Sequence, residues 1–375
     1  MRRVIVSVTN DLTTDNRVKR TCSLIHELGH EVLLVGRIRK NSLLPSEFPW
    51  KTKRFRLLFN KGPLFYAEYN MRLFFYLLVK KVDVLYANDL DTLPANFLAF
   101  KLKSKTKLIY DTHELFTEVP ELIHRKFAKN TWIKIESYIF PKLDHIVTVN
   151  ESIAKIYETK YDKPLLVVRN VPAKWNKEDI LSRTQLGLPP DKFIIIMQGS
   201  GLNVDRGLEE AVQAMQYIQN ALLVIVGNGD VIPQVKEMVC QKKLEDRVKF
   251  FEKRPYSEMM QFTSNANLGL TLDKPLSDNY KFSLPNKLFD YIQAGIPILS
   301  SDLVELRKII DKYQIGCIVD TVSATEIAQK INFLIENPNT LDEYKSNCHM
   351  AAECEIWEHE KLKLKSLLDK ILVLS

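Results

Sequence analysis

The sequence has few glycines, few cysteines and no long apolar run. Glycine contributes 12 of the 375 residues, which excludes collagen-like repeats and glycine-rich linkers. The cysteine count is odd and no C-x-x-C pair occurs. This disfavours both a disulfide framework and a structural zinc site, and it favours a reducing compartment. The cysteines are Cys22, Cys240, Cys317, Cys348 and Cys354.

Membrane-spanning and secretory segments are also not evident. No stretch of 18 uncharged apolar residues occurs, although a helix needs about that length to cross a bilayer. The opening MRRVIVSVTN contains two arginines and an apolar run that is too short for a signal-peptide core. We therefore expect a cytoplasmic protein. The 46% hydrophobic and 26% charged residues are typical of a globular chain, and the length predicts about two domains.

Charge is distributed unevenly between the two halves. Residues 1–172 carry 29 Lys and Arg against 18 Asp and Glu, a net +11, and residues 173–375 carry 24 against 28, a net −4. This asymmetry indicates either two domains with different partners, with an anionic membrane surface as a candidate for the first, or ordinary solvated surface charge. Nucleic acid is disfavoured, because no dense basic tract or recognised binding motif is present.

Short apolar strands alternate with amphipathic helices along the chain, which is typical of parallel α/β sheets. The pattern starts again after Pro172, where a polar run to Asp179 indicates a linker. We predict two doubly wound domains, 1–172 and 173–355, with a ligand cleft between them at the carboxyl ends of both sheets, and a helix over 356–375 that packs back toward the first domain. The expected strands are Arg3–Val8, Glu31–Val35, Val82–Ala87, Lys107–Tyr110, His145–Val149, Leu165–Val168, Phe193–Met197, Leu222–Val226, Val248–Phe251, Leu268–Thr271, Ile298–Ser300 and Gly316–Val319.

Two strands of the second half end in glycine pairs, Met197-Gln-Gly-Ser-Gly201 and Val226-Gly-Asn-Gly229. Neither pair completes the three-glycine dinucleotide pattern, so each one alone predicts only a tight turn. Arg206 follows the first pair and precedes a helix from Leu208, where it could meet a phosphate attracted by backbone amides.

The stretch 280–300 reads as a polar loop, a helix from Pro285 to Gly295 and a buried strand. Lys287 and Asp290 are three residues apart and share one helical face near the positive end of the helix dipole. They predict either contacts to a diphosphate and a sugar diol or a surface ion pair.

In the first half, polar residues follow the strands. The loop Asn10–Arg17 follows the first strand, and Thr13, Thr14 or Asp15 caps a helix that stops at Gly29. His113 follows the strand at 107–110, so it lies at a carboxyl sheet edge, where ligands gather.

The segment 64–81 is aromatic and basic, which would suit a membrane surface. Apolar residues occupy nearly every helical face between Leu73 and Val79, however, and this favours a buried helix.

The wording Ser283-Leu-Pro-Asn-Lys-Leu-Phe-Asp-Tyr291 resembles the donor-binding segment of retaining GT-B glycosyltransferases, in particular of glycosyltransferase family 4. The order of several other segments resembles the same family over nearly the whole chain. These segments are 193–207 with its Arg-Gly pair, Leu223-Val-Ile-Val-Gly227, Asn170-Val-Pro172, Asn88-Asp-Leu90, Tyr110-Asp-Thr-His-Glu114 and the terminal helix opened by Trp357.

The resemblance implies that a sugar moves from a nucleotide-diphosphate donor to an acceptor hydroxyl with retention of configuration. No cofactor or metal ion is then expected, and we expect the sequence to contain no D-x-D triplet that could bind one. The acceptor would be a glycan or a lipid-linked sugar in cell-surface polysaccharide or glycolipid synthesis. His113 would position the transferred sugar. Separately, the net charge of +11 on the first domain predicts peripheral attachment to the inner face of the membrane. The implied donor-binding residues are Gly199, Gly201, Arg206, Ser283, Leu284, Asn286, Lys287 and Asp290, and the implied sugar- or acceptor-side residues are Asn10, Asp15, Arg17 and Glu114.

The chain departs from the family pattern at two places. Phe282 replaces the first acid of the family's E-x7-E pattern, and Asp290 shortens the second. Ser200 or Gly201 stands at the first of two basic positions, so Lys287 would have to supply a charge beside Arg206. Two alternatives therefore stay open: a nucleotide-sugar epimerase of similar architecture and a non-catalytic sugar-nucleotide-binding protein.

Overall fold

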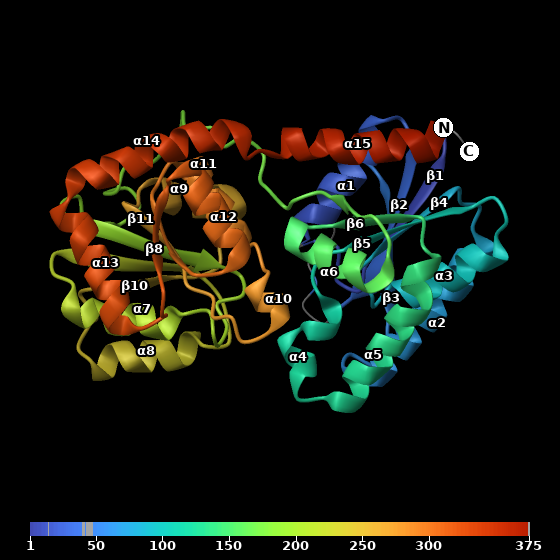
Figure 1. Ribbon diagram of the computed structural model, residues 1–375, viewed down its shortest axis with the longest axis horizontal. Helices are drawn as coiled ribbons and strands as arrows, with labels where there is room; N and C mark the ends of the chain where they lie inside the picture. The colour runs from blue at the N-terminus through green and yellow to red at the C-terminus, as the bar shows by residue number, and fades with distance from the viewer. Residues whose placement is uncertain (14, 40–41, 43–47, 374–375) are drawn as a thin grey trace. The chain divides into compact units, whose positions relative to one another are not determined.

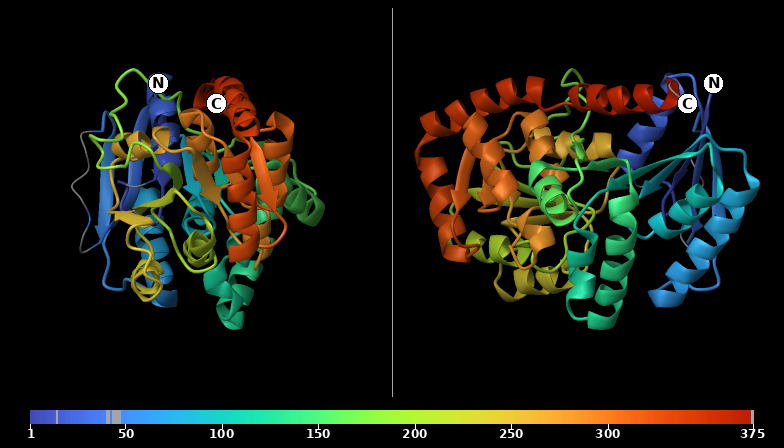
Figure 2. Two further views of the ribbon diagram at one scale, coloured as in Figure 1. Left: turned by 90° about the vertical axis from the view of Figure 1, so that its left-hand side faces the viewer. Right: turned by 45° about the vertical axis from the view of Figure 1, so that its right-hand side comes forward.

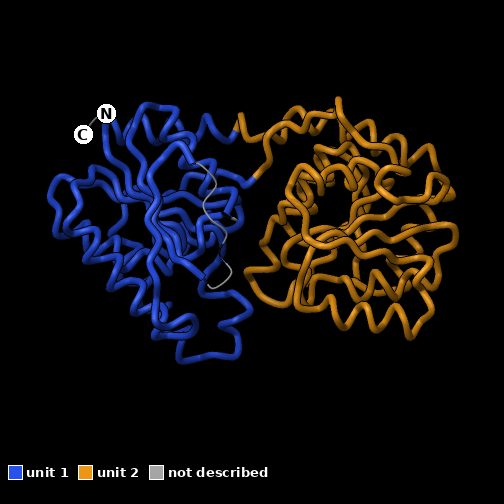
Figure 3. The backbone as a smooth tube through the Cα atoms, turned by 180° about the vertical axis from the view of Figure 1, so that it is seen from behind, with its two compact units in different colours: residues 1–170, 360–375 blue, residues 171–359 orange. Residues whose placement is uncertain are grey.

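The computed structural model describes residues 1–13, 15–39, 42 and 48–373. The chain forms two compact units, Met1–Asn170 with Glu360–Ser375, and Val171–His359 (Figure 3). Thr14, one of the three candidate helix caps, and Leu374 at the end of the expected terminal helix lie outside the described residues. Among those residues no helix is both long enough and apolar enough to cross a bilayer.

The first unit is built on a seven-stranded parallel sheet with the order β3-β2-β1-β4-β5-β6-β7. Strand β3 was not predicted, because its sequence KTKRFR is mostly charged and only Phe55 is buried. Its pairing with β2 makes it an edge strand, where charged side chains are tolerated. The strands are β1 (Arg3–Ser7), β2 (Glu31–Ile38), β3 (Lys51–Arg56), β4 (Val84–Asn88), β5 (Lys107–Thr112), β6 (His145–Thr148) and β7 (Leu166–Val167).

Helices cover both faces of this sheet (Figures 1 and 2). An ion pair between Glu136 of α5 and Lys160 of α6 joins these two helices. Both lie on the same face of the sheet as α2 and α3. Helices α1 and α15 are joined by Lys361 and Glu27 on the other face. The helices are α1 (Asn16–Glu27), α2 (Gly62–Val79), α3 (Leu93–Leu102), α4 (Pro120–Ile123), α5 (Lys126–Ile139), α6 (Glu151–Tyr161) and α15 (Trp357–Val373), with short 3-10 turns at Phe116–Glu118 and Phe140–Lys142.

Helix α1 begins where the sequence predicts a cap. Of the candidates, Asp15 is the N-cap, and its side chain accepts a hydrogen bond from the amide of Val18 at 3.1 Å. The helix ends one residue before Leu28, and Gly29 adopts a positive φ of 79°. A glycine is therefore the residue that lets the chain turn directly into β2.

The predicted burial of the segment 64–81 is wrong for one face of helix α2. The helix buries Phe65, Glu68, Tyr69, Leu73 and Leu77. Its other face leaves a row of apolar side chains exposed, because α2 lies against the rest of the unit along one side only. The row consists of Leu64 (58% exposed), Met71 (56%), Phe75 (60%) and Val79 (78%).

The last helix is fixed to the first unit by a buried ion pair. Glu360 is 1% exposed. It accepts one hydrogen bond from the backbone amide of Arg169 at 2.9 Å and another from the side-chain Nε of Arg169 at 2.8 Å. Leu364 and Leu368 are fully buried beside this pair. The chain therefore passes between the units twice, after Asn170 and after His359.

The second unit is built on a six-stranded parallel sheet with the order β10-β9-β8-β11-β12-β13. Alternate residues of β8 enter separate cores on the two faces: Ile195 and Met197 lie in one, and Ile194 and Ile196 in the other. This alternation explains why the strand is apolar at every position from Phe193 to Met197. The strands are β8 (Phe193–Gly199), β9 (Ala221–Gly227), β10 (Val248–Phe251), β11 (Leu268–Thr271), β12 (Ile298–Ser301) and β13 (Gly316–Val319).

The helices of this unit complete the two cores. Helices α7, α8 and α13 contribute to one core, and α9, α11, α12 and α14 to the other. Helix α14 was not predicted as a separate element. The helices are α7 (Leu208–Ala214), α8 (Ile232–Gln241), α9 (Tyr256–Ser264), α10 (Asp278–Lys281), α11 (Asn286–Ala294), α12 (Val304–Tyr313), α13 (Ala324–Glu336) and α14 (Pro338–Cys354), with a 3-10 turn at Met215–Tyr217.

Both sheets reverse their strand order at one point, between β1 and β4 in the first and between β8 and β11 in the second. In doubly wound sheets ligands bind beyond the carboxyl ends of the strands at this point. The residues that follow β1, β4, β8 and β11 lie at these points, and those that follow β5 lie one strand away.

Candidate active site

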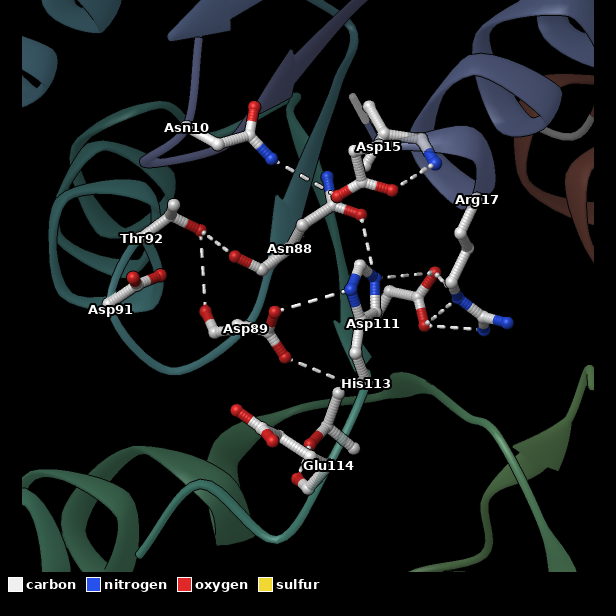
Figure 4. Close-up of polar contacts among 12 residues, drawn as sticks. Asn10, Asp15, Arg17, Asn88, Asp89, Asp91, Thr92, Asp111, His113 and Glu114 are labelled. Atoms are coloured by element: carbon white, nitrogen blue, oxygen red, sulfur yellow. Dashed lines mark hydrogen bonds and ion pairs between the residues drawn. The ribbon is translucent and has the colours of Figure 1, made fainter. Parts of the chain in front are cut away.

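His113 lies just after β5, one strand beyond the switch point of the first sheet (Figure 4). Its Nδ1 is 3.2 Å from the carboxylate of Asp89, and its Nε2 is 3.2 Å from Oδ1 of Asn88 and 3.7 Å from the carboxylate of Asp111. The amide of Asn88 is oriented by its Nδ2, which donates to the carbonyl of Ser7. Both ring nitrogens thus face acceptors, which is the environment of a doubly protonated imidazole.

The electrostatics agree with this geometry. Burial alone would lower the pKa of His113, but the carboxylates of Asp89 and Asp111 outweigh burial and raise the pKa to about 9. His113 is therefore a cation at neutral pH. The backbone amide of His113 also donates to Asp89 at 2.8 Å, so the same carboxylate fixes both the loop and the ring.

The guanidinium of Arg17 binds the carboxylate of Asp111. Its Nη2 is 2.7 Å from the carboxylate of Asp111, its Nε donates to both carboxylate oxygens, and its Nη1 donates to the carbonyl of Val168. Both side chains are almost fully buried, at 5% and 1% exposed. Burial would raise the pKa of Asp111, but Arg17 and His113 hold it well below its usual range. We therefore assign Arg17 to positioning the site.

The other residues expected on this side lie in the same region (Figure 4). Asn10 donates from Nδ2 to the carboxylate of Asp15 at 3.2 Å, so the loop after β1 is joined to the start of α1. Both side chains are half-buried. Glu114 follows His113, and its carbonyl accepts a hydrogen bond from the hydroxyl of Thr112.

The expectation that the sequence contains no D-x-D triplet is wrong, because the first unit contains Asp89-Leu90-Asp91. The two carboxylates have different partners: Asp89 contacts His113, and Asp91 accepts a 2.6 Å hydrogen bond from Thr9. Burial and the neighbouring Asp89 raise the pKa of Asp91 to about 7. Within the part of the chain that the structure describes, no group of three or more His, Cys, Asp or Glu side chains is arranged to hold a metal ion.

In the second unit, the glycine pairs allow two loops to touch. A Cβ at Gly227 would lie 1.8 Å from the carbonyl oxygen of Gly199, and one at Gly229 would lie 1.8 Å from that of Leu202. Gly199 has a φ of 153° and is half-buried, and Gly201 is exposed. The backbone of the loop after β8 therefore packs directly against the backbone of the loop after β9.

Arg206 and Lys287 converge on one carboxylate. Arg206 Nη1 is 2.6 Å from Asp273 Oδ1, and Lys287 Nζ is 3.8 Å from Asp273 Oδ2. Asp273 follows β11 and is fully buried, which would raise its pKa, but the two cations lower it. Burial lowers the pKa of Lys287. The cluster carries two positive charges and one negative charge, and the buried Nε of Arg206, whose guanidinium lies over the ring of Tyr280, makes no hydrogen bond.

Asp290 is 7% exposed and lies in an interior hydrogen-bond network. Its Oδ2 accepts from Nε2 of Gln198 at 3.1 Å, and its Oδ1 accepts from the hydroxyl of Tyr256 at 3.0 Å. Gln198 in turn accepts from the hydroxyl of Thr263. The alternative of a surface ion pair between Lys287 and Asp290 is wrong, because Asp290 is buried and Lys287 contacts Asp273.

The remaining donor-side residues surround the start of α11. Pro285 is the N-cap and Gly295, with a φ of 77°, ends the helix, as predicted. Ser283 donates from its hydroxyl to the carbonyl of Tyr280, and Leu284 packs on the core beneath α11. Asn286 is exposed at the first helical position.

Several site residues were not predicted, namely Asp89, Asp91, Asp111, Asp273, Gln198 and Tyr256. For Asp89 and Asp111 a signal was present, since each stands at or beside the carboxyl end of a strand next to the switch point. Asp273, two residues beyond β11, was detectable in the same way.

Two family descriptions match successive parts of the chain. The family described as Glycosyltransferase Family 4 matches residues 15–171, and the one described as Glycosyl transferases group 1 matches residues 179–349. The chain belongs to the group 1 glycosyltransferases.

Among curated proteins, this glycosyltransferase is similar to the amylovoran biosynthesis glycosyltransferase AmsK of Erwinia amylovora, with 23% identity over 39% of both chains. It is also similar to the chitobiosyldiphosphodolichol beta-mannosyltransferase of Candida albicans, with 21% identity over 58% of this chain and 52% of the relative. The matches therefore span about two fifths to one half of the relatives' lengths.

Solved structures share the GT-B fold of this glycosyltransferase. The sucrose-phosphate synthase of Thermosynechococcus elongatus matches with a TM-score of 0.82 and 15% identity over 100% of both chains. HepE of Anabaena, in complex with UDP-glucose, matches with a TM-score of 0.74 and 15% identity over 99% and 100% of the chains. A putative UDP-N-acetylglucosamine 2-epimerase from Listeria monocytogenes matches less well, with a TM-score of 0.65, 12% identity and coverage of 100% and 97%.

Proposed function

We propose that this group 1 glycosyltransferase transfers a sugar from a nucleotide-diphosphate donor to an acceptor hydroxyl, with retention of anomeric configuration and without a metal ion. The observation that carries the proposal is the cluster of Arg206, Lys287 and Asp273 at the switch point of the second sheet. Its net positive charge and the unsatisfied Nε of Arg206 suit the diphosphate of the donor, because a guanidinium binds phosphate oxygens through two N–H groups.

Within this proposal, protein cations take the place of a metal. Arg206 and Lys287 stabilise the negative charge that develops on the leaving diphosphate, and the backbone of the loop at Gly199 and Gly201 allows the phosphates to approach closely. Asp290 accepts hydrogen bonds from the donor ribose. Ser283, Leu284 and Asn286 border the donor at the start of α11.

His113 positions the transferred sugar in this mechanism. A histidine with a pKa of about 9 is protonated at neutral pH, so it donates hydrogen bonds and does not act as a base. The acceptor proton then passes to the departing phosphate oxygen on the same face of the sugar, which is the route to retention. Asn10, Asp15 and Glu114 line the sugar side.

Product stereochemistry tests the finer part of the proposal. With a nucleotide-sugar of known anomeric configuration, the first product formed should show the same configuration by proton NMR, and added EDTA should leave the rate unchanged. A product of inverted configuration would show that a base is needed and would contradict the assignment of His113. An EDTA-sensitive rate restored by a divalent cation would contradict metal independence.

The similarity to proteins named for amylovoran biosynthesis and for a diphosphodolichol-linked substrate supports a glycan or lipid-linked acceptor. An epimerase receives less support, because the epimerase structure matches less well. Phe282, which stands where the family pattern has an acid, is half-buried beside Ser283. Because that acid is missing, a non-catalytic binding protein stays the second alternative.

We further infer that the first unit attaches to an anionic membrane surface. Helix α3, which packs against α2, also exposes the apolar side chains of Leu98 (52%) and Leu102 (67%). Beside Val79 lies a hollow of about 590 Å³ with five basic side chains in its lining, Arg3, Lys80, Lys81, Lys103 and Lys105. Apolar side chains next to a basic hollow fit a bilayer that carries negative headgroups.

Vesicle flotation tests this attachment. The protein should float with phosphatidylglycerol vesicles at low salt and less at high salt, and Lys80→Glu/Lys81→Glu should reduce flotation. The matched control Lys242→Glu/Lys243→Glu changes two exposed lysines of the second unit and should have little effect. Equal flotation of all three proteins, or equal recovery on phosphatidylcholine vesicles, would contradict an electrostatic surface at this site.

A further inference from the structure

Arg37 is a buried cation that contacts no carboxylate among the described residues, although Asp91 lies near enough to act on its charge. It stands near the carboxyl end of β2 and is 7% exposed. Its Nη1 donates to the carbonyl of Asn60 at 3.3 Å, and its guanidinium carbon lies 4.0 Å above the ring of Phe65. Its Nε is buried and has no hydrogen-bond partner. Across the described residues, no Asp or Glu oxygen lies within 4.0 Å of this guanidinium.

Three other arginines, whose side chains are 5–24% exposed, contact a carboxylate, whereas the half-buried Arg183 and Arg247 donate to carbonyl and amide oxygens. Arg17 contacts Asp111 at 2.7 Å, Arg169 contacts Glu360 at 2.8 Å, and Arg206 contacts Asp273 at 2.6 Å. Removing a charge from water without a partner is costly, and arginine does not lose its proton in proteins. A folded chain that keeps such a cation therefore either tolerates a loss of stability or receives the missing anion from a ligand.

The position of Arg37 favours a ligand. Its backbone amide donates to the carbonyl of Asn10 at 2.9 Å, so it adjoins the loop after β1 that carries the sugar-side residues. A Cβ on the neighbouring Gly36 would lie 2.6 Å from that same carbonyl oxygen, so a larger residue there would push the loop away. Arg37 thus belongs to the carboxyl edge of the first sheet, where doubly wound folds bind ligands.

We propose that Arg37 binds an oxyanion carried by the acceptor, a phosphate or a carboxylate, and so selects acidic acceptors. This inference rests on the proposed function, which makes the first unit the acceptor side. The unpaired Nε and its neighbouring N–H form one edge of the guanidinium, and such an edge binds two oxygens of a phosphate or carboxylate at once. The stacked ring of Phe65 holds the guanidinium plane while the oxyanion is absent.

The test compares Arg37→Met with Arg37→Lys and with the control Arg56→Met, which changes an exposed arginine of β3. All four full-length proteins are made in the Arg206→Ala background, so that phosphate binding at the donor cluster does not obscure the result. The probes are inorganic phosphate, methyl phosphate and sodium glucuronate, followed by calorimetry and by melting temperature. Glucose serves as the uncharged probe.

Arg37→Met should weaken oxyanion binding by about 10-fold or more, the loss expected when a charge-assisted pair of hydrogen bonds is removed. Its melting temperature without oxyanion should be unchanged or higher, because an unneutralised buried charge is gone. Arg37→Lys should bind with intermediate affinity, and Arg56→Met should behave like the parent. Preference for the phosphates or for glucuronate identifies which oxyanion the acceptor carries.

Two results would overturn the proposal. In one, phosphate and glucuronate bind equally to the parent and to Arg37→Met. In the other, Arg37→Met melts well below the parent and shows no change in oxyanion affinity, which would make Arg37 a structural residue held by Phe65. Nucleoside diphosphate binding by the otherwise unaltered protein is measured in parallel. Its absence would count against the proposed function, whereas oxyanion binding that depends on Arg37 is a separate result.

Discussion

The buried pair of Arg17 and Asp111 yields the sharpest prediction, because it couples stability to the charge of His113. Replacing Asp111 by Asn removes one charge of a pair in which both side chains are at most 5% exposed. Breaking such a pair on one side costs about 3–5 kcal/mol of folding free energy, since the remaining charge stays buried. The free energy of unfolding of Asp111→Asn should fall by that amount at pH 7, as measured by urea denaturation.

The same substitution should change the titration of His113. The ring loses a carboxylate 3.7 Å from Nε2 and keeps a nearby, now unneutralised Arg17. Its pKa should therefore fall from about 9 by ~1–2 units, the usual effect of one neighbouring charge. In the unaltered protein the folded pKa lies above the ordinary value of 6.5. His113 therefore contributes stability that is fully present below pH 6.5 and is lost as the pH rises toward 9, and this loss should move to lower pH in the variant.

Proton NMR of the His113 ring follows the titration directly. The control Asp144→Asn changes an exposed carboxylate and should alter neither quantity. The double variant Arg17→Met/Asp111→Asn removes both charges and should recover much of the lost stability. Two results would contradict this coupling. One is a His113 pKa that stays near 9 in Asp111→Asn. The other is a loss of folding free energy below about 1 kcal/mol, whereas breaking a buried pair should cost several kcal/mol.

Three further predictions concern the second unit. Arg206→Ala and Lys287→Ala should each raise the nucleoside diphosphate dissociation constant by ~10-fold or more, and unchanged calorimetric affinity in both would remove their assignment to the diphosphate. Asp290→Ala should weaken donor binding by ~10–100-fold, while Asp290→Glu keeps substantial activity, and an unaltered donor KM in Asp290→Ala would eliminate the ribose contact. Gly227→Ala should lower the melting temperature strongly, because the added Cβ would overlap the carbonyl of Gly199. In the control Gly187→Ala the added Cβ meets no atom within 4 Å, so this variant should lose only about 1 kcal/mol of stability because of its positive φ. Similar melting temperatures for the two variants would contradict the close approach of the loops.

Most of the fold could be predicted because its strands are short apolar runs between clear helix caps. Phe193 and Leu268 begin strands where the sequence predicts them. Asp15 caps the start of α1 and Gly295 caps the end of α11, as expected. The sequence could not predict β3, because an edge strand such as 51–56 need not be apolar. The exposed face of α2 was missed because an apolar pattern does not distinguish a residue that faces the core from one that faces a partner.

The candidate site could be predicted only in part. Sequence spacing grouped Lys287 with Asp290, because residues three apart share a helical face. The structure instead brings Asp273 from another element to Lys287 and places Asp290 beside Gln198. Contacts of this kind depend on strand order, which a single sequence does not reveal. The same holds for Asp111, whose partners Arg17, Tyr86 and His113 lie 94 and 25 residues before it and two residues after it.

Acceptor-dependent release of nucleoside diphosphate tests the central claim most directly. The protein is incubated with a panel of nucleotide-sugars, with and without a lipid and glycan extract as acceptor, and the released diphosphate and any sugar isomer are quantified. The proposed sugar transfer predicts that one donor yields diphosphate only when acceptor is present, and that Arg206→Ala suppresses the release. An isomerised nucleotide-sugar formed without acceptor, or tight nucleotide-sugar binding with no release, would contradict it.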